Sequence, residues 1–259
     1  MPQIDFQNVS RTFATQGGTF RALDEVSLTI QDGEFVTVVG PSGCGKSTLL
    51  NIAAGLLAAD SGQVVVGDEV VAGTHPDRGV IFQQYALFPW MTVQKNVEFG
   101  PKLAGLSRSE RRERARHYID LVGLSDFANA LPKTLSGGMK QRCAIARAYA
   151  ADPKILLMDE PFGALDALTR VHMQERLLDA WSKERRTVMF ITHDVEEAVY
   201  LANRVVVMET KPGRIREIID VALPYPRTEE IRLSDEFADR RRRVWQAVYH
   251  QPAASGPDA

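Results

Sequence analysis

The sequence lacks the features that carry a chain across a membrane or into a disulfide-bonded secreted fold. Its longest apolar runs, such as Phe35 to Val39 and Val205 to Met208, are far shorter than the roughly 20 residues of a membrane-spanning helix. The N-terminus, Met1 to Asp5, has neither the basic start nor the apolar core of a secretion signal, so we expect no secretion. The two cysteines, Cys44 and Cys143, suit a reducing compartment better than a disulfide framework.

An excess of charge of either sign is also missing. Lys and Arg total 31 against 33 for Asp and Glu, and the formal net charge of −2 gives no global field that attracts nucleic acid. The arginines between Arg108 and Arg116 alternate with glutamates, which favours a solvated helix face over a nucleic-acid patch. We therefore expect no nucleic-acid partner. At 259 residues and 44% hydrophobic content, the chain can form one α/β domain or two subdomains that share a sheet.

The most informative segment begins at Gly40, directly after the apolar run that ends at Val39. Its order of strand, glycine-rich loop and helix is typical of a phosphate-binding loop, in which backbone N–H groups and a helix dipole face an anion. Lys46 is expected to neutralise the outer phosphates and the Ser47 hydroxyl to ligate Mg²⁺, so ATP or GTP binding is the first functional hypothesis. The cysteine of the loop should make the activity sensitive to alkylation. The predicted nucleotide-binding residues here are Gly40, Pro41, Ser42, Gly43, Cys44, Gly45, Lys46, Ser47 and Thr48.

Two later apolar segments end in residues suited to phosphate chemistry. Ile155 to Asp159 predicts a buried parallel strand that brings Asp159 and Glu160 to the carboxyl edge of a sheet. We assign Asp159 to Mg²⁺, directly or through water, and Glu160 to the attacking water as general base or orienting group. The apolar strand from Val188 ends at His193, a candidate γ-phosphate sensor, although a lone histidine at a strand end more often has a structural role.

A second anion-binding segment is predicted at Ser136 to Gly138. Ser136 stands where a helix N-cap belongs, and Gly137 and Gly138 expose backbone N–H groups at the start of the following helix. Taken alone, this segment is explained more simply as a capped helix. The two phosphate-type sites could fold onto one nucleotide, or the second could serve the nucleotide of a neighbouring chain.

The remaining segments predict the subdomains. Strands at 4–6 and 23–30 indicate an N-terminal antiparallel sheet, and the turn-rich loop 11–18 between them carries Phe13. This ring could stack on an adenine or be a buried loop aromatic. After Gln83 the sequence changes from strand-like to helix-like patterns, which predicts an inserted helical subdomain at about 84–152.

The C-terminal part predicts a helix from Ser234 with its arginine run, Arg240 to Arg243, toward solvent. Residues 251–259 are expected to be a flexible tail, which leaves 1–250 as a single domain. The apolar stripe expected to pack this helix on the domain consists of Phe237, Val244, Trp245 and Val248.

Taken in order, these motifs resemble the nucleotide-binding subunit of ABC transporters, over residues 3–220. Gly40 to Thr48 matches the Walker A loop, Ile155 to Asp159 the Walker B strand, and Leu135 to Gly138 the family's signature. The resemblance implies an α/β fold: a P-loop NTPase (RecA-like) core with an N-terminal antiparallel β-subdomain and an inserted α-helical subdomain. It also implies ATP and Mg²⁺ as ligands.

The resemblance further assigns individual roles and a dimer. It places Phe13 against the adenine, Gln83 in the Q-loop and on Mg²⁺, and Asp166 in the D-loop. Glu160 becomes the catalytic carboxylate and His193 the switch histidine. It implies a head-to-tail homodimer in which the signature of each subunit, with Ser136, Gly137 and Gly138, caps the ATP bound by its partner.

One departure from the family pattern points to a particular group of transporters within the family. Met139 stands where the family usually has Gln, and we expect activity to survive because the phosphate contacts come from Ser136 and backbone N–H groups. Together with Phe88 to Trp90 and Asp159 to Asp166, this Met is similar to importers of nitrate, sulfonate and taurine type.

The same resemblance implies partners and a location. It predicts an ATPase bound peripherally at the cytoplasmic face of the inner membrane to permease subunits, with a periplasmic or lipid-anchored substrate-binding protein. Phe88 and Trp90 are expected to contact the permease, unless Trp90 is buried in this subunit's own core. An ABC exporter subunit and, less favoured, a soluble ABC ATPase outside transport are the alternatives.

Overall fold

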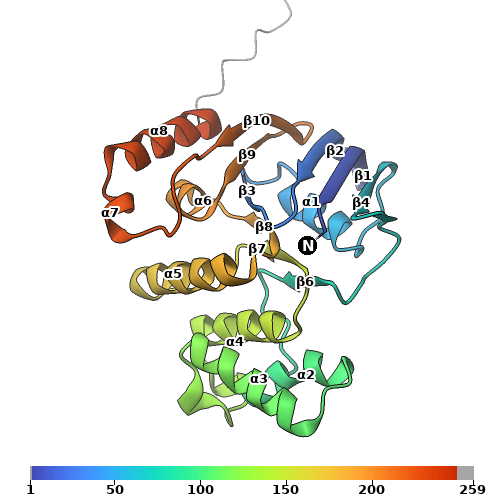
Figure 1. Cartoon of the computed structure of the whole chain (residues 1–259). Coiled ribbons are helices and arrows are strands. Elements are labelled where there is room, and N and C mark those ends of the chain that lie inside the picture. Colours follow the sequence, from blue (N-terminus) through green and yellow to red (C-terminus); the bar gives the residue numbers. More distant parts are fainter. Residues whose placement is uncertain (1, 250–259) are drawn as a thin grey trace, which may run out of the picture.

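The computed structural model describes residues 2–249, and Figure 1 shows how their elements are arranged. Within these residues the central sheet has six strands in the order β10-β9-β3-β8-β7-β6. Strands β6, β7, β8, β3 and β9 run parallel, and β10 pairs antiparallel with β9. The bounds are β3 (Phe35–Val39), β6 (Arg78–Ile81), β7 (Ile155–Asp159), β8 (Thr187–Ile191), β9 (Arg204–Glu209) and β10 (Arg214–Asp220).

Both faces of the middle strands pack against other elements, and their residues are accordingly apolar on both faces. Alternate residues of β8 belong to two separate clusters: Val188 and Phe190 face one, Met189 and Ile191 the other. The first cluster is completed by helices α2 to α6 and α8, and the second by α1 and the antiparallel sheet. The site-bearing strands are therefore packed between two hydrophobic layers.

The antiparallel sheet differs from the sequence-based expectation in one respect. Its order is β2-β1-β4-β5, with β1 (Ile4–Thr15), β2 (Gly18–Ile30), β4 (Ser61–Val66) and β5 (Glu69–Val70). The expected loop 11–18 is wrong, since β1 continues to Thr15 and Thr15 pairs with Gly18 across a tight hairpin. Register shifts between Phe6 and Thr12 interrupt the alternation of side chains, which hid the strand from a period-two reading.

Between Ile81 and Ile155 the described chain is helical and carries no strand. Helices α2, α3 and α4 pack against one another below the central sheet in Figure 1. Their N-caps are local and readable: Thr92, Ser107 and Ser136 each accept a bond from the backbone N–H three residues on. The bounds are α2 (Val93–Leu103), α3 (Arg108–Leu121), α4 (Gly137–Ala150) and two 3₁₀ turns (Ser125–Phe127, Pro132–Thr134).

The C-terminal helix packs on the domain, with one correction to the predicted stripe. Phe237, Val244 and Val248 are buried as expected, whereas Trp245 is 47% exposed, because it lies one residue round the helix from Val244. The expected tail at 251–259 lies outside the described residues. The remaining helices are α1 (Lys46–Ala53), α5 (Ala167–Glu184), α6 (Val195–Leu201), α7 (Glu229–Arg232) and α8 (Asp235–Tyr249). No helix within residues 2–249 combines the length and apolar character that crossing a bilayer requires.

Candidate nucleotide-binding and catalytic site

The predicted site residues gather where three neighbouring parallel strands end. Val38 of β3 pairs with Ile191 of β8, and Ile191 pairs with Asp159 of β7. The chain segments that follow these strands therefore leave the sheet at one edge, which brings the loop from Gly40 beside Glu160 and His193.

The loop after β3 needs its glycines for two different reasons. A Cβ on Gly40 would lie 2.5 Å from the Met208 oxygen, and one on Gly45 would lie 2.6 Å from the Ala22 oxygen, so space excludes any side chain at both. Gly43 has open space around its Cβ position but a φ of +80°, which L residues rarely adopt. The Gly40 to Gly45 backbone is thus set by its conformation and by its neighbours.

Lys46 opens α1 and is only 9% exposed. Its Nζ donates to the Gly40 oxygen at 2.8 Å and the Pro41 oxygen at 3.1 Å, and lies 3.7 Å from Sγ of Cys44. These carbonyls hold the ammonium inside the loop. A cation removed from water in this way favours a bound anion strongly.

Ser47 and Asp159 form a pair of oxygen donors next to Lys46. Burial raises the pKa of Asp159, while a hydrogen bond from the Ser47 hydroxyl opposes that shift. Mg²⁺ prefers hard oxygen ligands and usually keeps waters and phosphate oxygens, so one hydroxyl and one carboxylate fit its requirements. No group of three or more His, Cys, Asp or Glu side chains in residues 2–249 could hold a metal ion by itself.

Two other predicted catalytic residues, His193 and Gln83, contact the carboxylate of Glu160. Its backbone has a φ of 44° and its N–H donates to the Ile191 oxygen at 3.0 Å. Oε1 lies 3.3 Å from Nδ1 of His193, and Oε2 accepts from Nε2 of Gln83 at 3.2 Å. The carboxylate is therefore oriented by an imidazole and an amide from two other segments.

The signature segment meets the site of its own chain only at the edge. Ser136 accepts from the Met139 N–H at 3.3 Å, and no hydrogen bond of the described residues joins Ser136 to the phosphate loop. Gly138 packs beside Leu165, and a Cβ on Gly137 would lie 3.0 Å from the Tyr85 hydroxyl. Tyr85 was not predicted from sequence, because nothing local marks it.

Asp166 has a structural role in this chain. Its carboxylate caps α5 by accepting from the Thr169 N–H at 3.0 Å, and this bond to the backbone lowers the pKa of Asp166. Phe13 lies half-buried in β1 opposite Phe20, with the Arg11 guanidinium 5.0 Å from its ring centroid. A role for Phe13 at the adenine stays a prediction.

Sequence reasoning also missed a support under the phosphate loop. Gly213, in the turn between β9 and β10, packs its backbone against the Cys44 and Ala22 oxygens so closely that no side chain fits. Its own oxygen accepts from the Asp24 N–H at 2.9 Å, and the buried Asp24 carboxylate is paired with Arg21 and Arg214. In the sequence Gly213 indicates only a turn.

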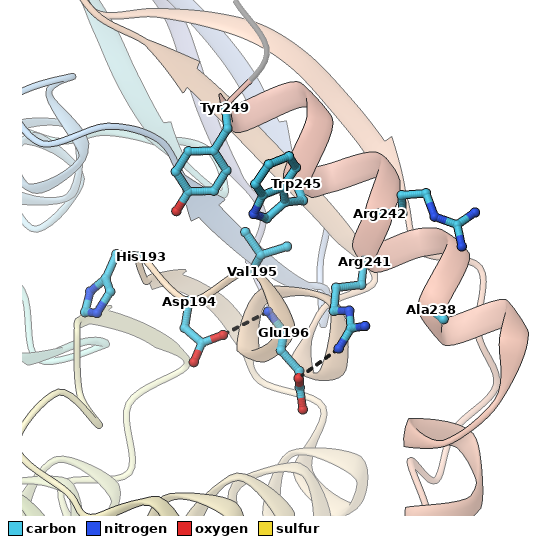
Figure 2. A pocket seen from close by; sticks show the side chains of 9 residues that line it. All are labelled: His193, Asp194, Val195, Glu196, Ala238, Arg241, Arg242, Trp245 and Tyr249. Carbon is cyan, nitrogen blue, oxygen red and sulfur yellow. Dashed lines mark hydrogen bonds and ion pairs between the residues drawn. The ribbon is translucent and has the colours of Figure 1, made fainter.

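His193 also borders a cleft of about 650 Å³ between the start of α6 and α8 (Figure 2). Trp245 and Tyr249 of α8 lie on one wall, with ring centroids 5.0 Å apart and ring planes tilted by 41°. Arg241 crosses from α8 to Glu196 of α6 at 3.3 Å. The segment after β8 is thus held by the C-terminal helix as well as by the sheet.

A glycine-rich loop around a buried lysine, with a hydroxyl and two carboxylates at one sheet edge, defines a P-loop nucleotide-binding protein. The profile of the ABC transporter family matches residues 23–163. The chain belongs to that family.

Known proteins match nearly the whole chain. It is 72% identical over 250 residues to an ATP-binding protein of Brucella abortus (strain 2308), covering 96% of this chain and 95% of that protein. It is 44% identical over 245 residues to an aliphatic sulfonates import ATP-binding protein, SsuB, of Bacillus cereus, 94% of each. It is 49% identical over 240 residues to the nitrate import ATP-binding protein NrtD of Synechocystis, 90% of each.

Solved structures of an ABC transporter cassette match the fold of this chain. The dimeric structure of the bacterial ABC transporter cassette MJ0796 matches with a TM-score of 0.79 at 34% identity, over 85% of this chain and 100% of that chain. A structure of the same cassette bound to ADP and Pi matches with a TM-score of 0.78. The predicted P-loop NTPase fold is confirmed, and the chain is an ATP-binding, ATP-hydrolysing subunit of the ABC transporter family.

Replacing Gly45 with alanine should abolish ATP binding. The left-handed backbone costs an alanine about 1–2 kcal/mol, and its Cβ would also clash with a fixed backbone oxygen 2.6 Å away. Gly17→Ala, in the β1–β2 turn with nothing within 4 Å of the new Cβ, is the matched control. Equilibrium ATP binding and thermal melting measure both variants. ATP binding by Gly45→Ala at the wild-type level would contradict this account of the loop.

The expected sensitivity of Cys44 to alkylation is corrected by the structure. Both cysteines are 0% exposed, and burial raises the pKa of the Cys44 thiol and raises that of Cys143 to about 12. Since the thiolate is the nucleophile, a raised pKa leaves less of it at pH 8 than a free cysteine has. Iodoacetamide at pH 8 should therefore leave the native chain unlabelled and label both thiols after denaturation, as read by intact mass. Rapid labelling of native Cys44 would show that the loop opens.

Proposed function

We propose that this subunit powers the import of a small anionic solute, such as nitrate, a sulfonate or taurine, through a separate permease. The observation that carries the proposal is similarity along nearly the whole chain to proteins named for aliphatic sulfonate and nitrate import. The subunit supplies the energy of ATP hydrolysis, and the permease and its binding protein select the solute.

Binding of the triphosphate is assigned to the loop and helix start after β3. The backbone N–H groups of residues 40 and 42–48 would face the phosphates, and the buried ammonium of Lys46 would neutralise them. Ser47 and Asp159, together with Gln83, are the residues that would hold Mg²⁺. The cation would supply neutralisation of the phosphate charge.

Hydrolysis is assigned to Glu160, which orients the attacking water or accepts its proton. The neighbouring His193 and Gln83, which contact the two oxygens of Glu160, hold the carboxylate in place. His193 is also assigned as the sensor of the γ-phosphate. Such positioning is effective because phosphoryl transfer depends mainly on geometry and charge stabilisation.

The complete site is proposed to need a second copy. Ser136 and the N–H groups of Gly137 and Gly138 would cap the nucleotide bound by the partner subunit in a head-to-tail homodimer. Support comes from the related cassette, whose structure is dimeric, and from the missing contact between Ser136 and the phosphate loop within the described part of one chain. Ala164 and Leu165, in the loop before Asp166, lie beside Gly138, and this face would meet the partner.

The permease is proposed to bind at Phe88 to Trp90. Trp90 is 71% exposed, which favours a partner surface over burial in this subunit's own core. Asn96 is fully buried and holds this loop: its Oδ1 accepts from the Phe88 N–H at 2.9 Å and its Nδ2 donates to the Met91 oxygen at 3.0 Å. Docking there would place the subunit peripherally at the cytoplasmic face of the inner membrane.

Co-purification from detergent-solubilised membranes tests the import proposal. We expect an integral-membrane permease to be recovered, and ATP hydrolysis by that complex in vesicles to rise when solute-loaded binding protein is added. Trp90→Ala should lower permease recovery at least about tenfold, as for a central interface tryptophan. Leu103→Ala, equally exposed on α2, is the control. A complex stimulated by no binding protein would favour an exporter, and recovery without any membrane partner would exclude transport.

Glu160→Gln should retain ATP binding while slowing hydrolysis roughly 10²–10⁴-fold, because the amide cannot accept a proton from water. If the homodimer forms as proposed, the variant should also accumulate as an ATP-bound dimer in size-exclusion chromatography. Glu175→Gln, an exposed carboxylate on α5, serves as the control. Normal turnover by Glu160→Gln would refute the assignment of Glu160.

A further inference from the structure

A buried carboxylate close to His193 has no part in the mechanism above. Glu197, on α6, is 5% exposed, and two further polar residues are buried with it: Thr192 (2%) at the end of β8 and Gln174 (4%) on α5. Buried polar groups of this kind are costly unless hydrogen-bonded. Their partners therefore show what the cluster holds together.

The hydrogen bonds of this cluster have a fixed direction. A guanidinium can only donate, so the bond from Nη2 of Arg232 to Oε1 of Gln174, at 3.0 Å, turns Nε2 of Gln174 toward Glu197. That Nε2 donates to Oε1 of Glu197 at 2.9 Å. The Thr192 hydroxyl accepts from the Asp194 N–H at 3.0 Å, and it also opposes the rise in pKa that burial causes at Glu197. The Glu197 carboxylate thus lies near the Gln174 amide and the Thr192 hydroxyl.

This arrangement fixes the backbone on both sides of His193. Thr192 precedes His193, and Asp194, which follows it, accepts at Oδ1 from the Glu196 and Glu197 N–H groups at 2.9 and 3.2 Å. The His193 side chain itself is 68% exposed, and its Nδ1 lies 3.3 Å from Oε1 of Glu160. Its position therefore depends on its neighbours in the chain.

The cluster also links this segment to the loop that precedes α5. Arg170 of α5 donates from Nη2 to the Leu165 oxygen at 3.1 Å, and its Nη1 lies 3.7 Å from Oδ2 of Asp194. Gln174 lies one helical turn further along α5 and reaches Glu197. Two loops of the site, one before α5 and one before α6, are thereby held at a set distance.

We propose that Glu197 is a positioning residue for ATP hydrolysis, which holds the Thr192 to Asp194 backbone so that His193 meets Glu160 and the γ-phosphate. The inference rests on the role proposed above for His193. A buried charge adds little stability compared with apolar packing, whereas its directional bonds define one geometry. The expected effect is therefore on turnover rather than on ATP binding.

Exchange of the hydrogen-bonding pair tests this proposal. In Glu197→Gln the amide keeps one acceptor oxygen and gains an N–H donor, so it can no longer offer acceptors toward both Gln174 and Thr192. We expect kcat to fall about tenfold with KM for ATP unchanged within about twofold. Adding Gln174→Glu restores complementary partners, since a carboxylate at 174 accepts from both Arg232 and the new amide. The double variant should recover kcat to within about threefold of wild type.

A stability control separates positioning from folding. Val199→Ala removes buried methyl groups from the same helix without touching the cluster, and should lower Tm while leaving kcat unchanged at temperatures well below the melt. If Glu197→Gln lowers Tm but not kcat, or if the exchanged pair fails to recover kcat while folding normally, the proposal is overturned.

The route through His193 is tested by a double-mutant cycle. His193→Ala should itself lower kcat, and adding Glu197→Gln to it should cost less than about twofold more, because the group being positioned is gone. A full additional tenfold loss would overturn the inference while leaving the role of His193 intact. An unchanged kcat in His193→Ala would instead refute the role proposed for His193.

Discussion

The parallel pairing of β3, β8 and β7 is the constraint on which the site depends. Each strand is too short and too buried to carry function along its length, and each releases its chain at the same sheet edge. Register converts distance in sequence into proximity: Gly40, Glu160 and His193 become neighbours because Val38 and Asp159 both pair with Ile191. A slip of one residue would turn the side chains of a strand to the opposite face and exchange its two apolar clusters.

The phosphate loop shows how an apparently local motif relies on distant chain. The Ala22 oxygen lies against Gly45, and the Met208 oxygen lies against Gly40. The Gly213 backbone packs on Cys44. The cost of burying the Lys46 ammonium is offset by carbonyls that this packing keeps in place. The β1–β2 hairpin and the β9–β10 hairpin therefore support the phosphate loop, although no phosphate ligand is assigned to either hairpin.

Whatever is encoded locally could be predicted from the sequence. The loop from Gly40, the acidic end of β7 and the Ser136 cap depend on residues within a few positions of one another, and each lies where its pattern placed it. The failures have tertiary causes. Register shifts in β1 hid its full length from the alternation pattern. Trp245 is exposed because it lies one residue round the helix from the buried Val244. Cys44 is buried by segments that are distant in the sequence. The buried group around Glu197 joins a strand and two helices, so no spacing in the sequence reveals it.

The bonds of Glu160 explain how one carboxylate can be both held and available. An ionised carboxylate has about four acceptor positions. Gln83 occupies one on Oε2 of Glu160, and Nδ1 of His193 lies 3.3 Å from Oε1. The remaining positions can accept from water, so orientation need not compete with chemistry. The two residues that orient Glu160 come from segments with other attachments: Gln83 leads through Tyr85 into the helical part that bears Trp90, and His193 leads into α6, which α8 contacts through Arg241 and Glu196. A shift of either segment would therefore alter the contacts that orient the Glu160 carboxylate.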